Sequence, residues 1–410
     1  MTVPAPRSLR AFPWLYALAN LGVHIGFIPL LVLLLPRRIE AIDPATSLER
    51  LSLVLIVGSV VASLANIAAG RWSDAAFRRL GDRRLPIAAG LVGLFASYAV
   101  MASAMRFELI LAGVIFFQIS LNTVFAPVTA LLADYVPDAR KGWVAGVINA
   151  PLPLASLLVA VLGFASTRDA VWPFWVTGAL SVACVLPLVA FWPTAGAAIA
   201  QRSDVQTGDA LTRDVRRDLR LAWFSRLFVQ MGGTLIASFL FLHLTGLARD
   251  IETIAAIGPS TAIATLSLLA MIAGPLVGLA GGWVSDRAGR RRALMVTGGA
   301  MIAVALGVIA APTGWAMLLT GYLVFTVGLA LYLTLHASLT AQILSDHPAR
   351  GALLSLFNLT NTIPAIIAPA IAWALHQPGG VSADLGVTLL IAAVLAGAAA
   401  VLILFIRAVD

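Results

Sequence analysis

The chain has 410 residues, of which 60% are hydrophobic and only 11% charged, and its formal net charge is +8. Ordinary soluble domains contain roughly 45–50% apolar and about 25% charged residues, so this composition excludes a soluble globular protein and predicts an integral membrane protein. A nucleic-acid partner is excluded because the arginines are distributed over many segments and do not gather in one basic region.

Apolar runs separated by short polar breaks recur along the whole chain. A helix needs about 20 apolar residues to cross the hydrocarbon core, where the backbone must satisfy its own hydrogen bonds. The predicted spans are 12–35, 50–70, 86–105, 108–133, 143–165, 172–192, 222–247, 259–283, 293–311, 315–344, 352–375 and 385–406. The predicted fold class is therefore all-α, with twelve transmembrane helices.

The basic residues divide unequally between alternate loops of these spans. Six of the 27 lie on one side, namely Arg37, Arg38, Arg50, Arg106, Arg168 and Arg249, and the other 21 lie on the side that holds both termini. Cytoplasmic loops are enriched in Lys and Arg, so we expect both termini in the cytoplasm. The alanine-rich composition with arginine in place of lysine is typical of a GC-rich bacterial genome, so we expect a multi-pass protein of the inner (plasma) membrane.

The second half of the chain repeats the first. The stretch GRWSDAAFRRLGDRRLPIAAG from Gly70 aligns with GWVSDRAGRRRALMVTGG from Gly282, and two further pairs of segments align at offsets between 208 and 212 residues. Duplicated halves are typical of transporter folds. We predict two six-helix bundles, 1–193 and 221–410, joined by the linker 194–220, which is either a solvated connector or an amphipathic helix on the membrane surface.

Twelve spans in two related halves, with the pattern Gly-x-x-x-Asp followed by Gly and consecutive arginines in the loops after the second and eighth spans, resemble the major facilitator superfamily. The resemblance covers the whole chain, and the first copy of the pattern is most similar to the sucrose-type and glycoside-pentoside-hexuronide cation symporters. It implies a conformational latch on the cytoplasmic side. The residues concerned are Gly70, Asp74, Gly81, Arg83 and Arg84 in the first copy, and Gly282, Asp286, Gly289, Arg290 and Arg291 in the second.

For these residues the alternative to a latch is a role in topology alone, which would be sufficient for most of the arginines. A second group of charges, Asp134 with Arg140 and Asp346 with Arg350, lies at the inner ends of later helices. The resemblance implies that this group forms a cytoplasmic charge network with the first. Ordinary helix capping and solvated surface pairs, worth about 0–1 kcal/mol each, would place the same residues there.

Proton-driven transport generally needs an ionisable group deep in the bundle. None of the 19 carboxylates falls in the middle of a predicted span, which departs from the symporters named above. His24, central in the first span, is the candidate for proton coupling, because histidine titrates near neutral pH. The alternative for His24 is a hydrogen-bonded packing role.

Polar side chains within the spans predict a solute site near the bilayer midplane, between the halves. The candidates are Asn20, His24, Gln118, Asn122, Asn149, Gln230, Tyr322, Thr326, Asn358 and Asn361. The group is rich in amides and contains no carboxylate or guanidinium group, so it favours a neutral polar or amphipathic solute. Hydrogen bonds that only join helices to one another are the alternative for each amide.

We therefore predict a transporter of a small neutral organic solute, such as a sugar or glycoside, that works by alternating access and is either secondary active, by symport with a proton or another cation, or facilitative. Efflux of amphipathic drug-like compounds by antiport is one alternative, and a receptor or assembly factor without flux is another. We expect a monomer in the bilayer, with no enzymatic activity, metal or cofactor. A P-loop is excluded because Lys141 is the only lysine, and Cys184, as the only cysteine, cannot form an intrachain disulfide.

Overall fold

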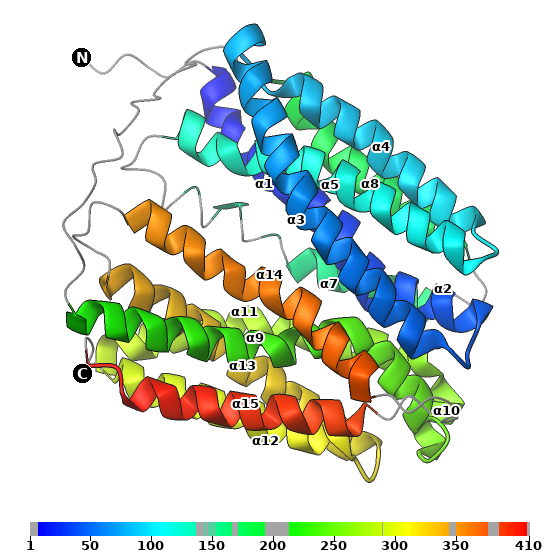
Figure 1. Cartoon of the computed structure of the whole chain (residues 1–410), viewed down its shortest axis with the longest axis vertical. Helices are drawn as coiled ribbons and strands as arrows, with labels where there is room; N and C mark the ends of the chain where they lie inside the picture. Colours follow the sequence, from blue (N-terminus) through cyan, green and yellow to red (C-terminus); the bar gives the residue numbers. More distant parts are fainter. Residues whose placement is uncertain are drawn as a thin grey trace. The chain divides into compact units, whose positions relative to one another are not determined.

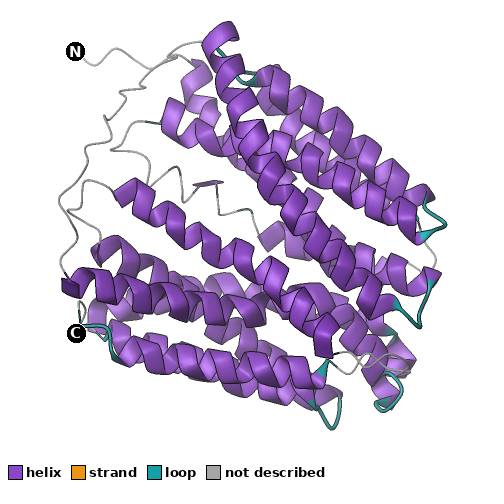
Figure 2. Ribbon diagram, viewed as in Figure 1, coloured by secondary structure: helices purple, strands orange, loops and turns teal. Residues whose placement is uncertain are grey.

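The computed structural model describes residues 7–136, 144, 147–148, 151, 153–165, 171–192, 213–288, 290–343, 350–375 and 385–407. Within these ranges the chain is helical, with short loops and no strand (Figure 2). Ten helices are long and apolar enough to cross a membrane, and the apolar stretches Pro153–Ala165 and Leu359–Leu375 stand where the fifth and eleventh spans were predicted. The all-α membrane fold expected from the sequence is confirmed.

Figure 1 labels the helices in chain order. They are α1 (Arg7–Pro29), η1 (Leu30–Leu34), α2 (Leu35–Ile42), α3 (Ser47–Leu80), α4 (Arg84–Ser103), α5 (Phe107–Tyr135), α7 (Pro153–Ala165), α8 (Trp172–Ala190), α9 (Arg213–Leu247), α10 (Glu252–Ile257), α11 (Pro259–Ala288), α12 (Arg291–Ala310), α13 (Trp315–Ile343), α14 (Arg350–Leu375) and α15 (Gly386–Leu404).

The chain divides into two compact units. One comprises residues 1–44 and 57–202, and the other comprises residues 45–56 and 203–410. In the first unit α4 packs against α5 and α8, and α1 packs against α8 and α7. In the second unit α12 packs against α13 and α15, while α9 packs against α15 and α14 (Figure 1).

Small residues let the helices of the first unit approach closely. A Cβ added to Gly22 of α1 would lie 2.8 Å from the carbonyl oxygen of Ser181 on α8, and the Ser181 hydroxyl donates to the Gly22 carbonyl at 2.7 Å. One turn later the hydroxyl of Tyr98 on α4 donates to the Gly26 carbonyl at 2.6 Å. Lipid tails are as apolar as the side chains of these helices, so the hydrophobic effect does not drive the helices together inside a bilayer. Close backbone contacts and interhelical hydrogen bonds supply much of the helix association instead.

Helix α3 differs from its prediction, because the basic patch from Arg71 to Arg79 is helical and belongs to no loop. No proline interrupts this stretch, so the helix continues for ten residues beyond the predicted end at residue 70. It stops at Gly81, whose φ of +78° is readily adopted only by glycine, and whose N–H donates to the Phe77 carbonyl at 3.0 Å. This is a left-handed C-terminal cap.

The elements η1 and α10 were not expected, and α9 begins before the predicted span 222–247, within the linker for which a helix was one alternative. A π-helical turn, η1, follows directly on Pro29, which lacks the N–H that a regular helix would use. Helix α9 begins at Arg213, so residues 213–220 of the predicted linker form its first turns. Residues 194–212 of the linker lie outside the described residues. The short helix α10 lies between α9 and α11.

Candidate functional site

Arg83 is the centre of a charged cluster in the first unit. It precedes α4, and its Nη1 donates to the Ser73 hydroxyl at 2.7 Å and to Asp74 Oδ1 at 2.8 Å, both on α3. Its Nε donates to Oδ2 of Asp134, near the end of α5, at 2.8 Å. One guanidinium group therefore joins the ends of three helices.

The burial of this cluster makes its bonds stronger than those of an ordinary surface pair. The side chain of Arg83 is 6% exposed and that of Asp134 is 15% exposed, whereas that of Asp74 is 57% exposed. Burial lowers the pKa of Arg83, but hydrogen bonds and charge attraction from Asp134 and Asp74 outweigh it, so the pKa lies above its ordinary value. Arg83 is a permanent cation, more tightly coupled to Asp134 than to Asp74.

The short loop between α3 and α4 positions this arginine. Gly81 ends α3, and the carboxylate of Asp82 accepts the backbone N–H of Arg84 at 3.0 Å, which satisfies a free donor at the start of α4. The Phe77 ring lies 4.9 Å from the guanidinium carbon of Arg83. At Gly70 an added Cβ would meet no described atom within 4 Å, so the structure shows no close helix approach there.

The second copy of the pattern is described in part. Arg291 Nη1 donates to Oε1 of Gln342 on α13 at 2.7 Å, and Arg290 is an exposed residue that precedes α12. Gly282 lies in α11, where an added Cβ would be 3.8 Å from Thr334. Asp286 also lies in α11, but its side chain is outside the described part of the chain, as is Gly289.

The predicted charge network is likewise described in part. Asp134 joins the Arg83 cluster directly. Arg140 and Asp346 lie outside the described residues, and Arg350 begins α14 with a side chain that is not described. The structure thus brings Asp74 and Arg83 of the first predicted latch copy together with Asp134 of the predicted network.

In the first unit, the predicted cavity residues bind one another and the backbone. Asn20 Nδ2 donates to the Ile148 carbonyl at 2.9 Å. Asn122 Nδ2 donates to the Gln118 carbonyl at 2.8 Å, and its Oδ1 accepts from Asn66 of α3 at 3.1 Å. Asn66 was not among the sequence candidates, although it is an amide in an apolar run. Asn149 lies outside the described residues.

His24 is half-buried, one turn after Asn20 on α1. Its Nδ1 lies 2.8 Å from the Asn20 carbonyl oxygen. A carbonyl oxygen only accepts, so Nδ1 carries the proton and Nε2 is the nitrogen left for another partner. The geometry thus leaves His24 able to exchange a proton through Nε2.

In the second unit, Gln230 Nε2 on α9 donates to Oδ1 of Asn361 on α14 at 2.6 Å, and this pair is exposed. The Thr326 hydroxyl donates to the carbonyl of Tyr322, one turn earlier on α13, at 2.9 Å. Asn358 lies in α14, but its side chain is not described. The two amides that the structure brings together here therefore come from different helices.

Sequence reasoning missed a second group of polar residues in this unit. Arg226 of α9 was counted with the cytoplasmic arginines although the predicted span 222–247 includes it, and it lies in the candidate membrane span Arg213–Leu247 and is half-buried. It is close enough to Tyr332 and His336 of α13 to interact with both electrostatically. An arginine within the apolar run LAWFSRLFVQ was the signal that could have shown it.

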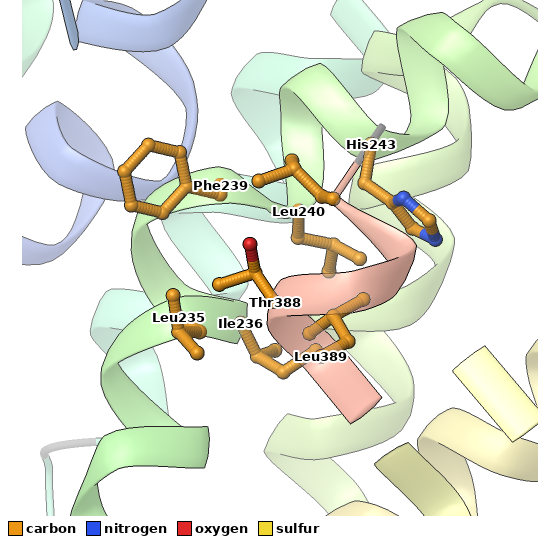
Figure 3. A pocket seen from close by; sticks show the side chains of 8 residues that line it. Leu235, Ile236, Phe239, Leu240, His243, Thr388 and Leu389 are labelled. Atoms are coloured by element: carbon orange, nitrogen blue, oxygen red, sulfur yellow. The ribbon is translucent and has the colours of Figure 1, made fainter. Parts of the chain in front are cut away.

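Figure 3 shows an apolar crevice between α9 and α15. Its lining includes Leu235, Phe239 and Thr388, with His243 at its edge, and its volume is about 10 Å³. That is room for about one water molecule. His243 Nε2 is bonded to the Ile309 carbonyl at 2.7 Å, so this crevice is too small, and its histidine too committed, to hold an organic solute.

Metal binding finds no support in the part of the chain that the structure describes. No group of three or more His, Cys, Asp or Glu side chains is placed there to hold an ion. The polar groups of the predicted cavity residues are amides, hydroxyls and an imidazole, all of which can form hydrogen bonds with an organic solute.

Comparison with known proteins identifies the architecture. A family model described as Major Facilitator Superfamily matches residues 11–369. A bacterial homologue of the human lysosomal transporter Spinster, in an inward-facing and occupied conformation, is 15% identical with a TM-score of 0.68, covering 98% of this chain and 97% of that one. The nucleoside transporter NupG, solved as a point mutant, is 16% identical with a TM-score of 0.66, covering 96% of this chain and 98% of that one. No curated protein matches the chain significantly.

Proposed function

The chain belongs to the Major Facilitator Superfamily and is a multi-pass membrane transporter rather than an enzyme, and we propose that it moves a small, hydrogen-bonding organic solute, such as a sugar or glycoside, by alternating access. Both termini are proposed to be cytoplasmic, in a bacterial inner membrane. The two solved transporters named above share its fold, and at 15–16% identity they do not define its solute.

The observation that carries the proposal is the placement of amides within apolar helices of both halves. In the first half Asn20, Asn66 and Asn122 take part in hydrogen bonds between or within helices. In the second half Gln230 and Asn361 form an exposed pair. An amide that donates one hydrogen bond keeps further donor and acceptor capacity, which a solute with hydroxyl groups can use.

The Arg83 cluster is proposed as the latch that controls the change of conformation. It is a charge-assisted junction of α3, α4 and α5, and its buried part is the pair of Arg83 and Asp134, which joins α4 to α5. Asp74 is the member that can change partners, because its side chain is 57% exposed. The second copy, from Gly282 to Arg292, is proposed to act in the same way.

His24 is proposed as the proton-coupling residue, because its Nδ1–H is bonded to the Asn20 carbonyl and its Nε2 has no partner among the described residues. Symport with a proton follows if the solute moves only when Nε2 binds one. The same residue would serve antiport equally well, so direction must be measured.

The test is uptake of radiolabelled sugars, glycosides and amphipathic drugs into proteoliposomes with and without a proton gradient. We expect gradient-dependent flux in the wild type, gradient-independent flux in His24→Gln, and slowed exchange in Asp74→Asn. The control for Asp74→Asn is Asp250→Asn, which removes an exposed carboxylate from the loop after α9.

Each other outcome points elsewhere. Wild-type flux that ignores the gradient would identify a facilitator in which His24 only packs. Accumulation of drugs outward, with no sugar uptake, would favour the efflux alternative. No flux for any compound would overturn the transport proposal and favour a receptor or assembly factor.

A further inference from the structure

Arg226 is a cation without a counterion among the described residues of the second unit. It lies on α9 within the candidate membrane span Arg213–Leu247, one turn after the predicted start of the apolar run at residue 222. Within the part of the chain that the structure describes, no carboxylate pairs with it, and its Nε is buried without a hydrogen-bond partner. Asp218, two turns earlier on α9, accepts instead from the backbone N–H of Arg407 at 3.0 Å.

The polar neighbours of Arg226 do not neutralise it. His336 is fully buried, and its Nε2 donates to the Ala222 carbonyl at 2.8 Å, while its Nδ1 has no partner. The Tyr332 hydroxyl is hydrogen-bonded to Ser225, whose hydroxyl also donates to the Ala399 carbonyl at 2.8 Å. None of these neighbours is a carboxylate, and each is bonded to another of them or to the backbone.

Arg226 also shares a helix face with Gln230, four positions later on α9. Gln230 is bonded to Asn361, and this amide pair is exposed. Arg226 itself is half-buried, so part of its side chain remains accessible. Arg226 and Gln230 therefore lie one turn apart on α9, and Asn361 lies beside Gln230 on the adjoining α14. Together they offer a permanent cation and two amides that keep further hydrogen-bonding capacity.

We infer that Arg226 binds an anionic oxygen group, a carboxylate or a phosphate, on the transported solute, while Gln230 and Asn361 bind its neutral hydroxyl groups. Guanidinium groups match the geometry of these anions with paired N–H donors. A charged residue in a membrane bundle is costly without a counterion, and a solute that supplies one removes that cost on binding. The inference rests on the proposed transport function and changes its expected solute from a neutral sugar to an acidic or phosphorylated one.

The first experiment measures thermal unfolding of the full-length protein in detergent with matched probes. These are D-glucuronate, D-gluconate and glucose 6-phosphate, each compared with D-glucose. We expect at least one anion, and not D-glucose, to raise the wild-type midpoint. Arg226→Gln should weaken the apparent affinity for that anion at least roughly tenfold, and Arg226→Lys should restore part of it.

The control variant is Arg220→Gln, because Arg220 is exposed on the same helix. It should bind the anion as the wild type does. Stabilisation by an anion that survives in Arg226→Gln, stabilisation by D-glucose alone, or no stabilisation by any of the anions would overturn the inference.

A second measurement needs no ligand. If Arg226 lacks a counterion, Arg226→Gln should raise the midpoint of the solute-free protein by a few degrees, whereas a lowered midpoint would show a structural role and overturn the inference. Flux separates this failure from failure of the transport proposal. Uptake of neutral sugars that is unchanged in Arg226→Gln would overturn only the anion site, and absence of all flux would overturn transport itself.

Discussion

In the first half of the molecule Arg83 donates to the carboxylate of Asp134, and in the second half Arg291 donates to the amide oxygen of Gln342. Arg291 follows Arg83 by 208 positions, and Gln342 follows Asp134 by the same number. The two bonds are 2.8 and 2.7 Å long. The first is a buried ion pair and the second ends on a neutral, exposed side chain. The repeat therefore preserves the position of a hydrogen bond between equivalent helices while changing its charge.

The helix crossings repeat more closely than the charges do. On α4, a Cβ added to Gly90 would lie 3.0 Å from the Ser120 carbonyl oxygen and 2.7 Å from Val124. On α12, a Cβ added to Gly298 would lie 3.1 Å from the Gly328 carbonyl oxygen and 3.3 Å from Tyr332. At this crossing an added methyl group would meet main-chain atoms at 3.0–3.1 Å in both halves, so the neighbouring helix would have to shift to admit it.

The largest expected difference between the halves comes from removing the two arginines. Arg83→Met leaves the carboxylate of Asp134 largely buried and unpaired, and should lower the free energy of unfolding by about 3 kcal/mol. Asp74 adds little to this loss, since an exposed partner is screened by solvent. Arg291→Met removes the neutral bond to Gln342, which is worth about 1 kcal/mol, together with the other contacts of this side chain.

These values can be measured by unfolding the two variants in mixed detergent micelles. Equal losses would show that the charge of Asp134 contributes nothing beyond a hydrogen bond, and would remove the distinction between the halves.

The next effect concerns the shared crossing. Gly90→Ala should destabilise by about 1–3 kcal/mol, because the added methyl group overpacks a close helix contact. Gly298→Ala should cost less, since its nearest contact is longer. Gly307 is the control: it lies in α12 with no atom within 4 Å of an added Cβ, so Gly307→Ala should leave stability unchanged or raise it by up to about 1 kcal/mol. A harmless Gly90→Ala would contradict the close approach.

A smaller effect is expected when the first half is given the chemistry of the second. Asp134→Asn keeps an oxygen acceptor for Arg83 but removes its charge, and should cost about 1 kcal/mol, since charge-assisted hydrogen bonds are about twice as strong as neutral ones. A double-mutant cycle with Arg83→Met isolates the coupling energy. Coupling that is unchanged in the asparagine variant would argue against an ionic contribution.

The smallest effect is the reverse change. Gln342→Glu places a carboxylate beside Arg291 on an exposed side chain, and should stabilise by about 0.5 kcal/mol at low ionic strength. The gain should disappear in about 1 M salt, where charges are screened beyond roughly 3 Å. A gain that persists in high salt would mean that the pair is buried.

Much of the fold was predictable because the bilayer imposes length and apolarity on each span. The ends of the helices were less predictable. The basic residues after 70 were predicted as a loop, and they are helical, because arginine is a good helix former and the chain contains no breaker before Gly81. Likewise Arg226 was counted with the cytoplasmic arginines, since a charge near a span end has the same sequence pattern whether it is solvated or buried.

The candidate site was predictable as a set of residues, but its pairings were not. Asn20, Gln118, Asn122, Gln230 and Asn361 could be selected because amides are rare in apolar spans. The sequence could not show that Gln230 binds Asn361, or that Asn122 binds Asn66, because these partners are 131 and 56 positions apart. Asp346, predicted as the counterpart of Asp134, lies outside the described residues, and the bond from Arg291 to Gln342 could not be predicted because Gln342 is not a charged residue.

From the sequence alone follow the membrane environment, the twelve spans, the duplication and the two arginine-containing patterns, because each depends on composition or on spacing along the chain. The tertiary structure alone decided that Arg83 joins three helices, that its counterpart Arg291 binds an amide, and that Arg226 lacks a carboxylate among the described residues. The reason is physical: hydrogen bonds and ion pairs depend on distances of about 3 Å between side chains, which are set by helix rotation and packing.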